Sequence, residues 1–332
     1  MFLPEARGAL TELLFRNLAS SPVDFIPPGR IDDDPLSGND FQLALYCCYE
    51  LHYRGFEEVD QRWEWNPSLL AFRAALEERF EAALVAAVGD LSPRSDSVAE
   101  DLIDLSAADE GPSLARYMET RGTEAQYLEF LIHRSAYQLK EADPHSWAIA
   151  RLEGKPKAAL VEIQGDEYGG GDPERIHAVL FGRSMRAMGL DDRYGAYLGI
   201  LPGVTLATVN VMSFFGLHRR WRGALVGHLA LFEMTSTEPN RRYGSGLRRL
   251  GHGSDATFFF DEHVEADSVH EQIAAHDLAG ALARQEPALA SDILFGAAAL
   301  QHLEDRWARH LLDSWAAGRS SLLQDRFVSQ RA

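Results

Sequence analysis

Residues 258–272 read FFFDEHVEADSVHEQ, and this stretch decides the interpretation of the whole chain. His263, Asp267 and His270 stand at positions i, i+4 and i+7, so one face of an α-helix would carry all three about a turn apart. Two imidazoles and a carboxylate on one face form a mixed nitrogen and oxygen site that suits iron or manganese. The alternative is a solvated polar face, because the same segment carries further acidic residues.

The segments on both sides of this stretch also follow helical patterns. Thr123 and Gln126 have capping-box spacing, and the run DPE at 172–174 restarts a helix after the glycines 169–171. We expect helices at about 1–19, 40–54, 67–88, 123–142, 156–168, from 172, 203–215, 219–237, from 261, 277–286 and 289–318. Residues 89–112 are acidic and serine-rich and are expected to form a linker or loop. Strand-like alternation is sparse, which predicts an all-α fold.

Composition limits the class of protein and its partners. The chain has 332 residues, of which 46% are hydrophobic, as in ordinary globular proteins of one or two domains. Its formal net charge of −18 argues against nucleic acids and anionic membranes as partners. The first residues lack a signal-peptide pattern, and we expect no membrane span. Cys47 and Cys48 are adjacent and have no other cysteine to pair with, which predicts buried free thiols and a cytoplasmic location.

Glu233 interrupts a mostly apolar helix, WRGALVGHLALFEM. The residues three, four and seven positions before it are all apolar, so this carboxylate is expected on the buried face. A buried charge needs a partner or it becomes neutral. The partner could be a metal ion, or an arginine such as Arg219 or Arg222.

The segment GDEYGGGDPERIHAVL, residues 165–180, carries two further candidates, Glu167 and His177. Three glycines between them would let the backbone bend and direct both side chains inward. Glu174 is a rival ligand, because Glu174-x-x-His177 has the i, i+3 spacing of di-iron bundles. A plain turn with a surface glutamate is the other alternative.

Glu141, in YQLKEADPH, is expected near the end of a helix, where a negative charge is unfavourable with the helix dipole. Its position therefore suggests a role other than helix stability, although a solvent-facing glutamate would look the same in sequence. Four carboxylates and three neutral imidazoles would balance the four positive charges of two Fe(II) ions. The full expected set is Glu141, Glu167, His177, Glu233, His263, Asp267 and His270.

The order of these residues resembles the heme-oxygenase-like di-iron oxidases and oxygenases, a group of iron-containing redox enzymes. The shared order is Glu, Glu, His, Glu and then His-x-x-x-Asp-x-x-His, here from Glu141 to His270. The run Asp166–Gly169 followed by His177 is similar to the N-oxygenase branch of that group. The resemblance covers residues 120–275 well. It is looser over residues 1–115, which resemble an N-terminal helical region that some members use for dimerisation.

The resemblance implies an all-α, heme-oxygenase-like bundle at residues 116–332 that binds two irons and no heme. It implies O2 as cosubstrate, an external electron donor, a small-molecule substrate and a homodimer. We expect N-oxygenation of an amine or amino acid. Oxidative C–C cleavage and desaturation of a fatty or amino acid are the alternatives within the same fold.

Three other interpretations remain open from sequence alone. A ferritin-like pattern would use Glu174 and leave His263 and Glu167 unexplained. Heme binding would need an early proximal histidine, for which His52 is the candidate. A non-catalytic interaction protein would use the carboxylates as ordinary salt-bridge partners.

Overall fold

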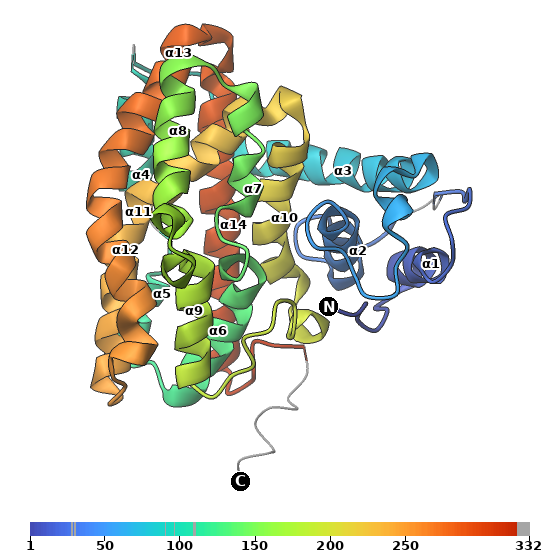
Figure 1. The fold of residues 1–332 in the computed structure, drawn as a ribbon, viewed down its shortest axis with the longest axis horizontal. Coiled ribbons are helices and arrows are strands. Elements are labelled where there is room, and N and C mark those ends of the chain that lie inside the picture. Colours follow the sequence, from blue (N-terminus) through green and yellow to red (C-terminus); the bar gives the residue numbers. More distant parts are fainter. Residues whose placement is uncertain (28, 30, 90, 96, 109–110, 324–332) are drawn as a thin grey trace.

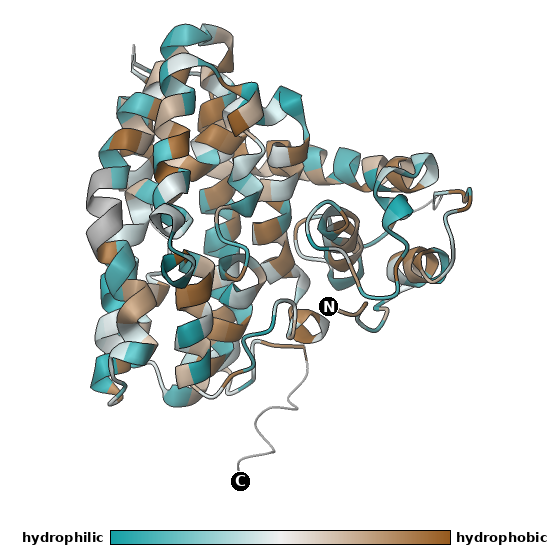
Figure 2. Ribbon diagram, in the orientation of Figure 1, coloured by the Kyte–Doolittle hydropathy of each residue, from teal (hydrophilic) through white to brown (hydrophobic). Residues whose placement is uncertain are grey.

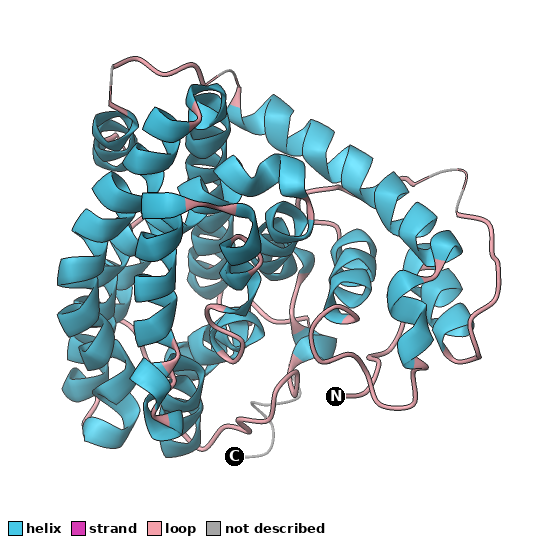
Figure 3. Cartoon of the chain, turned by 45° about the horizontal axis from the view of Figure 1, so that its top comes forward, coloured by secondary structure: helices cyan, strands magenta, loops and turns pink. Residues whose placement is uncertain are grey.

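The computed structural model describes residues 1–323 except 28, 30, 90, 96 and 109–110, and only the backbone of residues 265–269. All regular elements in the described part are helices (Figure 3). The expected all-α fold is therefore confirmed. The helices form a tall bundle, and a smaller group of N-terminal helices lies against one side of it (Figure 1).

The N-terminal group comprises the first three α-helices and one short 3-10 turn: α1 (Ala9–Leu18), α2 (Asn39–Glu50), η1 (Gln61–Trp65) and α3 (Pro67–Val88). The expected helix at 67–88 is confirmed to the residue, because Asn66 caps the Leu69 backbone amide and Pro67 occupies the first turn. Cys47 and Cys48 lie buried and free in α2, as predicted.

The bundle comprises the remaining helices. Its first half contains α4 (Val98–Ala107), α5 (Leu114–Thr120), α6 (Glu124–Gln138), α7 (Asp143–Ser146), η2 (Ile149–Arg151), α8 (Gly154–Glu167), η3 (Gly169–Gly171), η4 (Pro173–Arg175) and α9 (His177–Ala187). Its second half contains η5 (Leu198–Ile200), α10 (Gly203–Leu217), η6 (Arg219–Trp221), α11 (Arg222–Arg249), α12 (Ser254–Gln272), a π-helical segment η7 (Ile273–Ala279), α13 (Gly280–Gln285), η8 (Pro287–Leu289) and α14 (Ala290–Ala316).

The central helix α11 packs along both α12 and α14. At the contact with α14 the two backbones touch, because Gly227 faces the carbonyl of Ile293 and Gly296 faces the carbonyl of Ala224. A Cβ atom on either glycine would overlap that carbonyl oxygen, so only glycine permits this approach. The seam fixes the separation of the two longest helices of the core.

Helix α10 joins the bundle to the N-terminal group. It is apolar for most of its length (Figure 2), and nearly all of its residues are buried. It packs on α2, where the Asn210 side chain donates hydrogen bonds to the backbone and side-chain oxygens of Gln42. None of the described helices is long and apolar enough to cross a membrane.

A buried ion pair makes a second connection between the two groups. The Lys140 ammonium lies 3.2 Å from the Glu50 carboxylate, and the two side chains are 1% and 0% exposed. The Tyr194 hydroxyl donates a 2.6 Å hydrogen bond to the same carboxylate. Lys140 immediately precedes Glu141, so this pair anchors the backbone next to an expected metal ligand.

Several expected boundaries were wrong. Residues 89–112 are not simply a linker: Ser97 caps α4, and Val98, Ala99 and Leu102 bury one face of it against the bundle. Helix α11 continues through Pro239 to Arg249 instead of ending at 237, since packing along α12 and α14 outweighs the lost backbone hydrogen bond.

Two other boundaries also changed. Helix α12 starts at Ser254, a full turn or more before the expected start near Asp261. Helix α6 opens with the predicted Thr123–Gln126 capping box but ends at Gln138, so Glu141 lies in the following turn and not in a helical C-terminus.

Candidate metal centre

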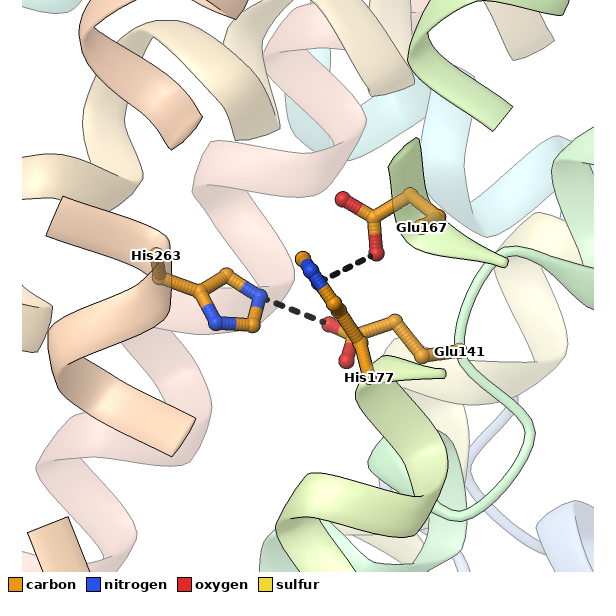
Figure 4. Close-up of side chains that lie close together, drawn as sticks. All are labelled: Glu141, Glu167, His177 and His263. Carbon is orange, nitrogen blue, oxygen red and sulfur yellow. Dashed lines mark ion pairs between the residues drawn. The ribbon is translucent and has the colours of Figure 1, made fainter. Parts of the chain in front are cut away.

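Four of the expected ligands meet in the middle of the bundle (Figure 4). Glu141 follows α6, Glu167 ends α8, His177 begins α9 and His263 lies on α12. One oxygen or nitrogen atom from each lies within 4.8 Å of the others, and all four side chains are buried. In this group Nδ1 of His177 is 2.8 Å from Oε2 of Glu167, and Nε2 of His263 is 3.5 Å from Oε1 of Glu141.

A second buried group lies beside the first and shares one residue with it. It consists of Glu167, Glu233 and His270, whose ligand atoms again lie within 4.8 Å of one another. Nδ1 of His270 is 3.4 Å from Oε2 of Glu233. Glu167 is thus a member of both groups.

Each histidine from α12 is held by its second ring nitrogen. Nδ1 of His263 is 2.8 Å from the carbonyl oxygen of Phe259, one turn earlier in α12. Nε2 of His270 is 3.0 Å from the carboxylate of Asp166, which neighbours Glu167. Such contacts fix the ring orientation and leave the other nitrogen directed into the centre.

The electrostatics of the centre favour the binding of a positive charge next to its buried carboxylates. Burial raises the pKa of Glu141, although the neighbouring His263 opposes the rise. Burial likewise raises the pKa of Glu233, opposed by its hydrogen bond with His270. Burial acts to lower the pKa of His270, but its contacts with Glu233 and Asp166 outweigh burial and raise it to about 9.

The three glycines between Glu167 and His177 bend the backbone, as expected. Gly169, Gly170 and Gly171 all have positive φ angles, of 71°, 60° and 90°. A Cβ on Gly169 would also lie 2.7 Å from the backbone carbon of Arg175, so the chain folds tightly on itself here. This reversal brings the end of α8 next to the start of α9.

A different device positions Glu141. Ala142, the residue after it, has a φ of 71°, a left-handed conformation that is strained for a residue with a Cβ. The Gln164 side chain stabilises this turn by donating to the Ala142 carbonyl at 2.8 Å and to the Ser146 hydroxyl at 2.7 Å. Sequence analysis did not identify Gln164, because a mid-helix glutamine carries no signal of such a contact.

The seventh expected ligand, Asp267, lies within α12, but its side chain is outside the described residues. The rival ligand Glu174 is exposed in η4 and belongs to neither group. Arg222, one of the arginines expected as an alternative partner of Glu233, pairs with Glu286 instead. Both ring nitrogens of His52 contact protein groups, Glu64 and Arg73.

The donor set fits iron. It offers three carboxylates and three imidazoles in the described part of the chain, all buried, and no thiolate, which is the ligation that non-heme iron prefers. A cation would also remove the cost of burying the carboxylates together.

The family model described as iron-containing redox enzyme matches residues 128–305, more than half of the chain. The chain belongs to this family. The match begins within α6 and ends within α14, so it contains every helix that carries an expected ligand. The iron and the oxidoreductase class that were expected from sequence are those of this family.

One relative of this iron-containing redox enzyme is nitrosourea synthase from Streptomyces achromogenes subsp. streptozoticus. The two are 26% identical over 136 residues, which make up 41% of this chain. The aligned segment covers only 29% of the length of that synthase.

Proposed function

We propose that this iron-containing redox enzyme binds two iron ions and uses them, with O2, to oxidise a small organic molecule. The observation that carries the proposal is the shared position of Glu167. Two ligand groups with one carboxylate in common suit two cations close together better than one. No heme is involved in this proposal, because carboxylates line the centre.

The reaction we favour is N-oxygenation of an amine or amino acid. The similarity to a nitrosourea synthase supports this choice over C–C cleavage or desaturation. Transfer of one oxygen atom from O2 to nitrogen leaves the second atom to form water, which requires two protons and two electrons from an external donor. The iron pair supplies the site where O2 is reduced.

The residues of the chain have separate parts in this proposal. Six described side chains, Glu141, Glu167, His177, Glu233, His263 and His270, bind the metals, and Asp267 is proposed as the seventh ligand. Phe259 and Asp166 orient His263 and His270 through their second nitrogens. Burial of the six described ligands limits the access of water to the reacting groups. A cytoplasmic homodimer, with residues 1–115 at its interface, is part of the same proposal.

Metal analysis tests the proposal directly. The protein is loaded anaerobically with Fe(II), desalted and assayed for iron and for O2 consumption. We expect about two irons per chain and rapid O2 uptake. His177→Ala and His270→Ala should each bind less iron, whereas His276→Ala, at an exposed position, should bind as much as the wild type. An iron-free protein, or a heme Soret band, would refute the proposal.

A further inference from the structure

A cavity of about 380 Å³ lies next to the metal centre. It shares the side chains of Phe232, Ser236 and His263 with the small space among the ligands. A cavity of this volume is large enough for a small organic molecule. A molecule bound in this cavity would contact His263, whose side chain lines both the cavity and the metal centre.

Seven aromatic side chains form one part of the cavity wall. Phe130 and Tyr243 face each other with ring centroids 4.5 Å apart, and Phe181 and Phe259 lie 5.0 Å apart. Phe232, Phe260 and Trp307 complete this apolar surface. The cavity therefore suits a ligand whose body is a hydrocarbon chain or a ring.

Among the described residues that line the cavity, Arg134 is the only arginine or lysine, and it is already paired. Arg134 forms two hydrogen bonds with Glu304, of 2.9 and 2.7 Å, and its guanidinium lies 3.9 Å from the Trp307 ring centre. An anionic ligand would have to displace Glu304 from Arg134, so the cavity disfavours an anionic head group.

Gln138 supplies the second, independent observation. Its side chain lines the cavity and is 9% exposed, and its carboxamide oxygen has no hydrogen-bond partner among the described residues. Leaving a buried acceptor unsatisfied is costly, so such an atom marks a place where a donor belongs. Phe130, Arg134 and Gln138 follow each other one turn apart on α6, and Glu141 comes three residues later.

We propose that the cavity binds an aliphatic or aromatic monoamine, with the amine donating a hydrogen bond to Oε1 of Gln138. The apolar body packs among the rings, and the head group lies at the end of α6 that leads to the metal centre. Gln138 is then the residue that selects an N–H donor over a carboxylate. The identity of this molecule as substrate rests on the proposed function, but its binding does not.

Calorimetric titration under anaerobic conditions tests the proposal with the full-length, iron-loaded protein. The probes are hexylamine and hexanoate, which differ only in the head group, and 2-phenylethylamine. We expect both amines to bind at least about tenfold more tightly than hexanoate. Equal or tighter binding of hexanoate would overturn the proposal.

Variants locate the contact. Gln138→Leu should weaken hexylamine at least about tenfold and reduce the preference over hexanoate, whereas Gln138→Glu should keep or strengthen amine binding. Gln61→Leu, at an exposed site in the N-terminal group, is the matched control. It should change neither the affinity for hexylamine nor the preference for hexylamine over hexanoate. Unchanged amine affinity in folded Gln138→Leu would overturn the assignment, and so would lost affinity in folded Gln138→Glu.

The two proposals fail differently. Iron binding and O2 consumption without amine selectivity would refute the cavity assignment alone. Amine-selective binding in a protein that takes up no iron would refute the proposed function and leave the cavity assignment intact.

Discussion

Oε2 of Glu167 lies 2.8 Å from Nδ1 of His177, although nine residues, three of them consecutive glycines, separate the helices that carry them. The glycines take positive φ angles, and the chain between the two residues doubles back on itself. Two of the six described candidate ligands thus depend on a backbone reversal for their positions.

Gly169→Ala should disrupt this reversal. The new Cβ would lie 2.7 Å from the backbone of Arg175, and the φ of 71° would be strained as well. We expect lower stability, by more than about 1–2 kcal/mol, the usual cost of a left-handed conformation, and a loss of bound iron. Gly170→Ala is the control, because its φ is also positive but the added Cβ meets nothing within 4 Å. Urea unfolding and iron analysis distinguish the two. Equal effects would show that crowding at Gly169 does not matter.

Replacing the shared carboxylate should have a larger effect than replacing a ligand of one group. Glu167 belongs to both buried groups, whereas His177 belongs to one and His270 to the other. Glu167→Ala should therefore lower the occupancy of both proposed metal positions, and each histidine variant should mainly lower one. Iron content combined with Mössbauer spectroscopy measures this. The prediction fails if Glu167→Ala retains as much iron as His177→Ala.

Breaking the buried ion pair should destabilise the protein strongly. Lys140→Met leaves the carboxylate of Glu50 buried without its cation, which typically costs about 3–5 kcal/mol. Lys155 pairs with Asp277 at the surface, where both side chains are about half exposed, so Lys155→Met should cost no more than about 1 kcal/mol. Chemical denaturation of the two variants provides the comparison, and similar losses in both would contradict it.

Acid should destabilise the fold through His133. Burial lowers the pKa of His133 well below 6.5, while its ring nitrogens contact Thr205 and Ser321. The folded protein keeps this ring neutral, but the unfolded chain takes up a proton below about pH 6.5, so stability falls as pH drops. His133→Gln should reduce the pH dependence of the free energy of unfolding by about 1.4 kcal/mol per pH unit between about pH 6 and 5. Urea titrations of the wild type and the variant over this pH range measure the difference, and equal pH dependence of stability in both would contradict the prediction.

Sequence pattern predicted most of the helices because helix formation depends on local spacing, and it singled out six side chains that the structure brings close together. The capping box at Thr123 and the proline at 67 act within one turn, and the i, i+7 spacing of His263 and His270 places both on one helix face. Glu233 was identifiable because its neighbours on the helix are apolar, which predicts burial whatever the partner.

Features that depend on tertiary packing were not predictable in the same way. Nothing local to Pro239 indicates that α12 and α14 hold α11 together beyond it. The contact of Asp166 with His270 joins residues 104 positions apart, and Gln138 became notable only when its oxygen was found buried in a cavity wall. Such contacts require the three-dimensional arrangement.

The seam between Gly227 and Gly296 has a consequence for redesign. Leu231 and Leu300, which line the cavity, stand one turn beyond these glycines on their helices. The backbones of α11 and α14 already touch at this seam. A larger side chain at either glycine would therefore separate the two helices and would not narrow the cavity. Changes in the size of the ligand that the cavity accepts should therefore be made at the facing residues on α6, α9 and α12.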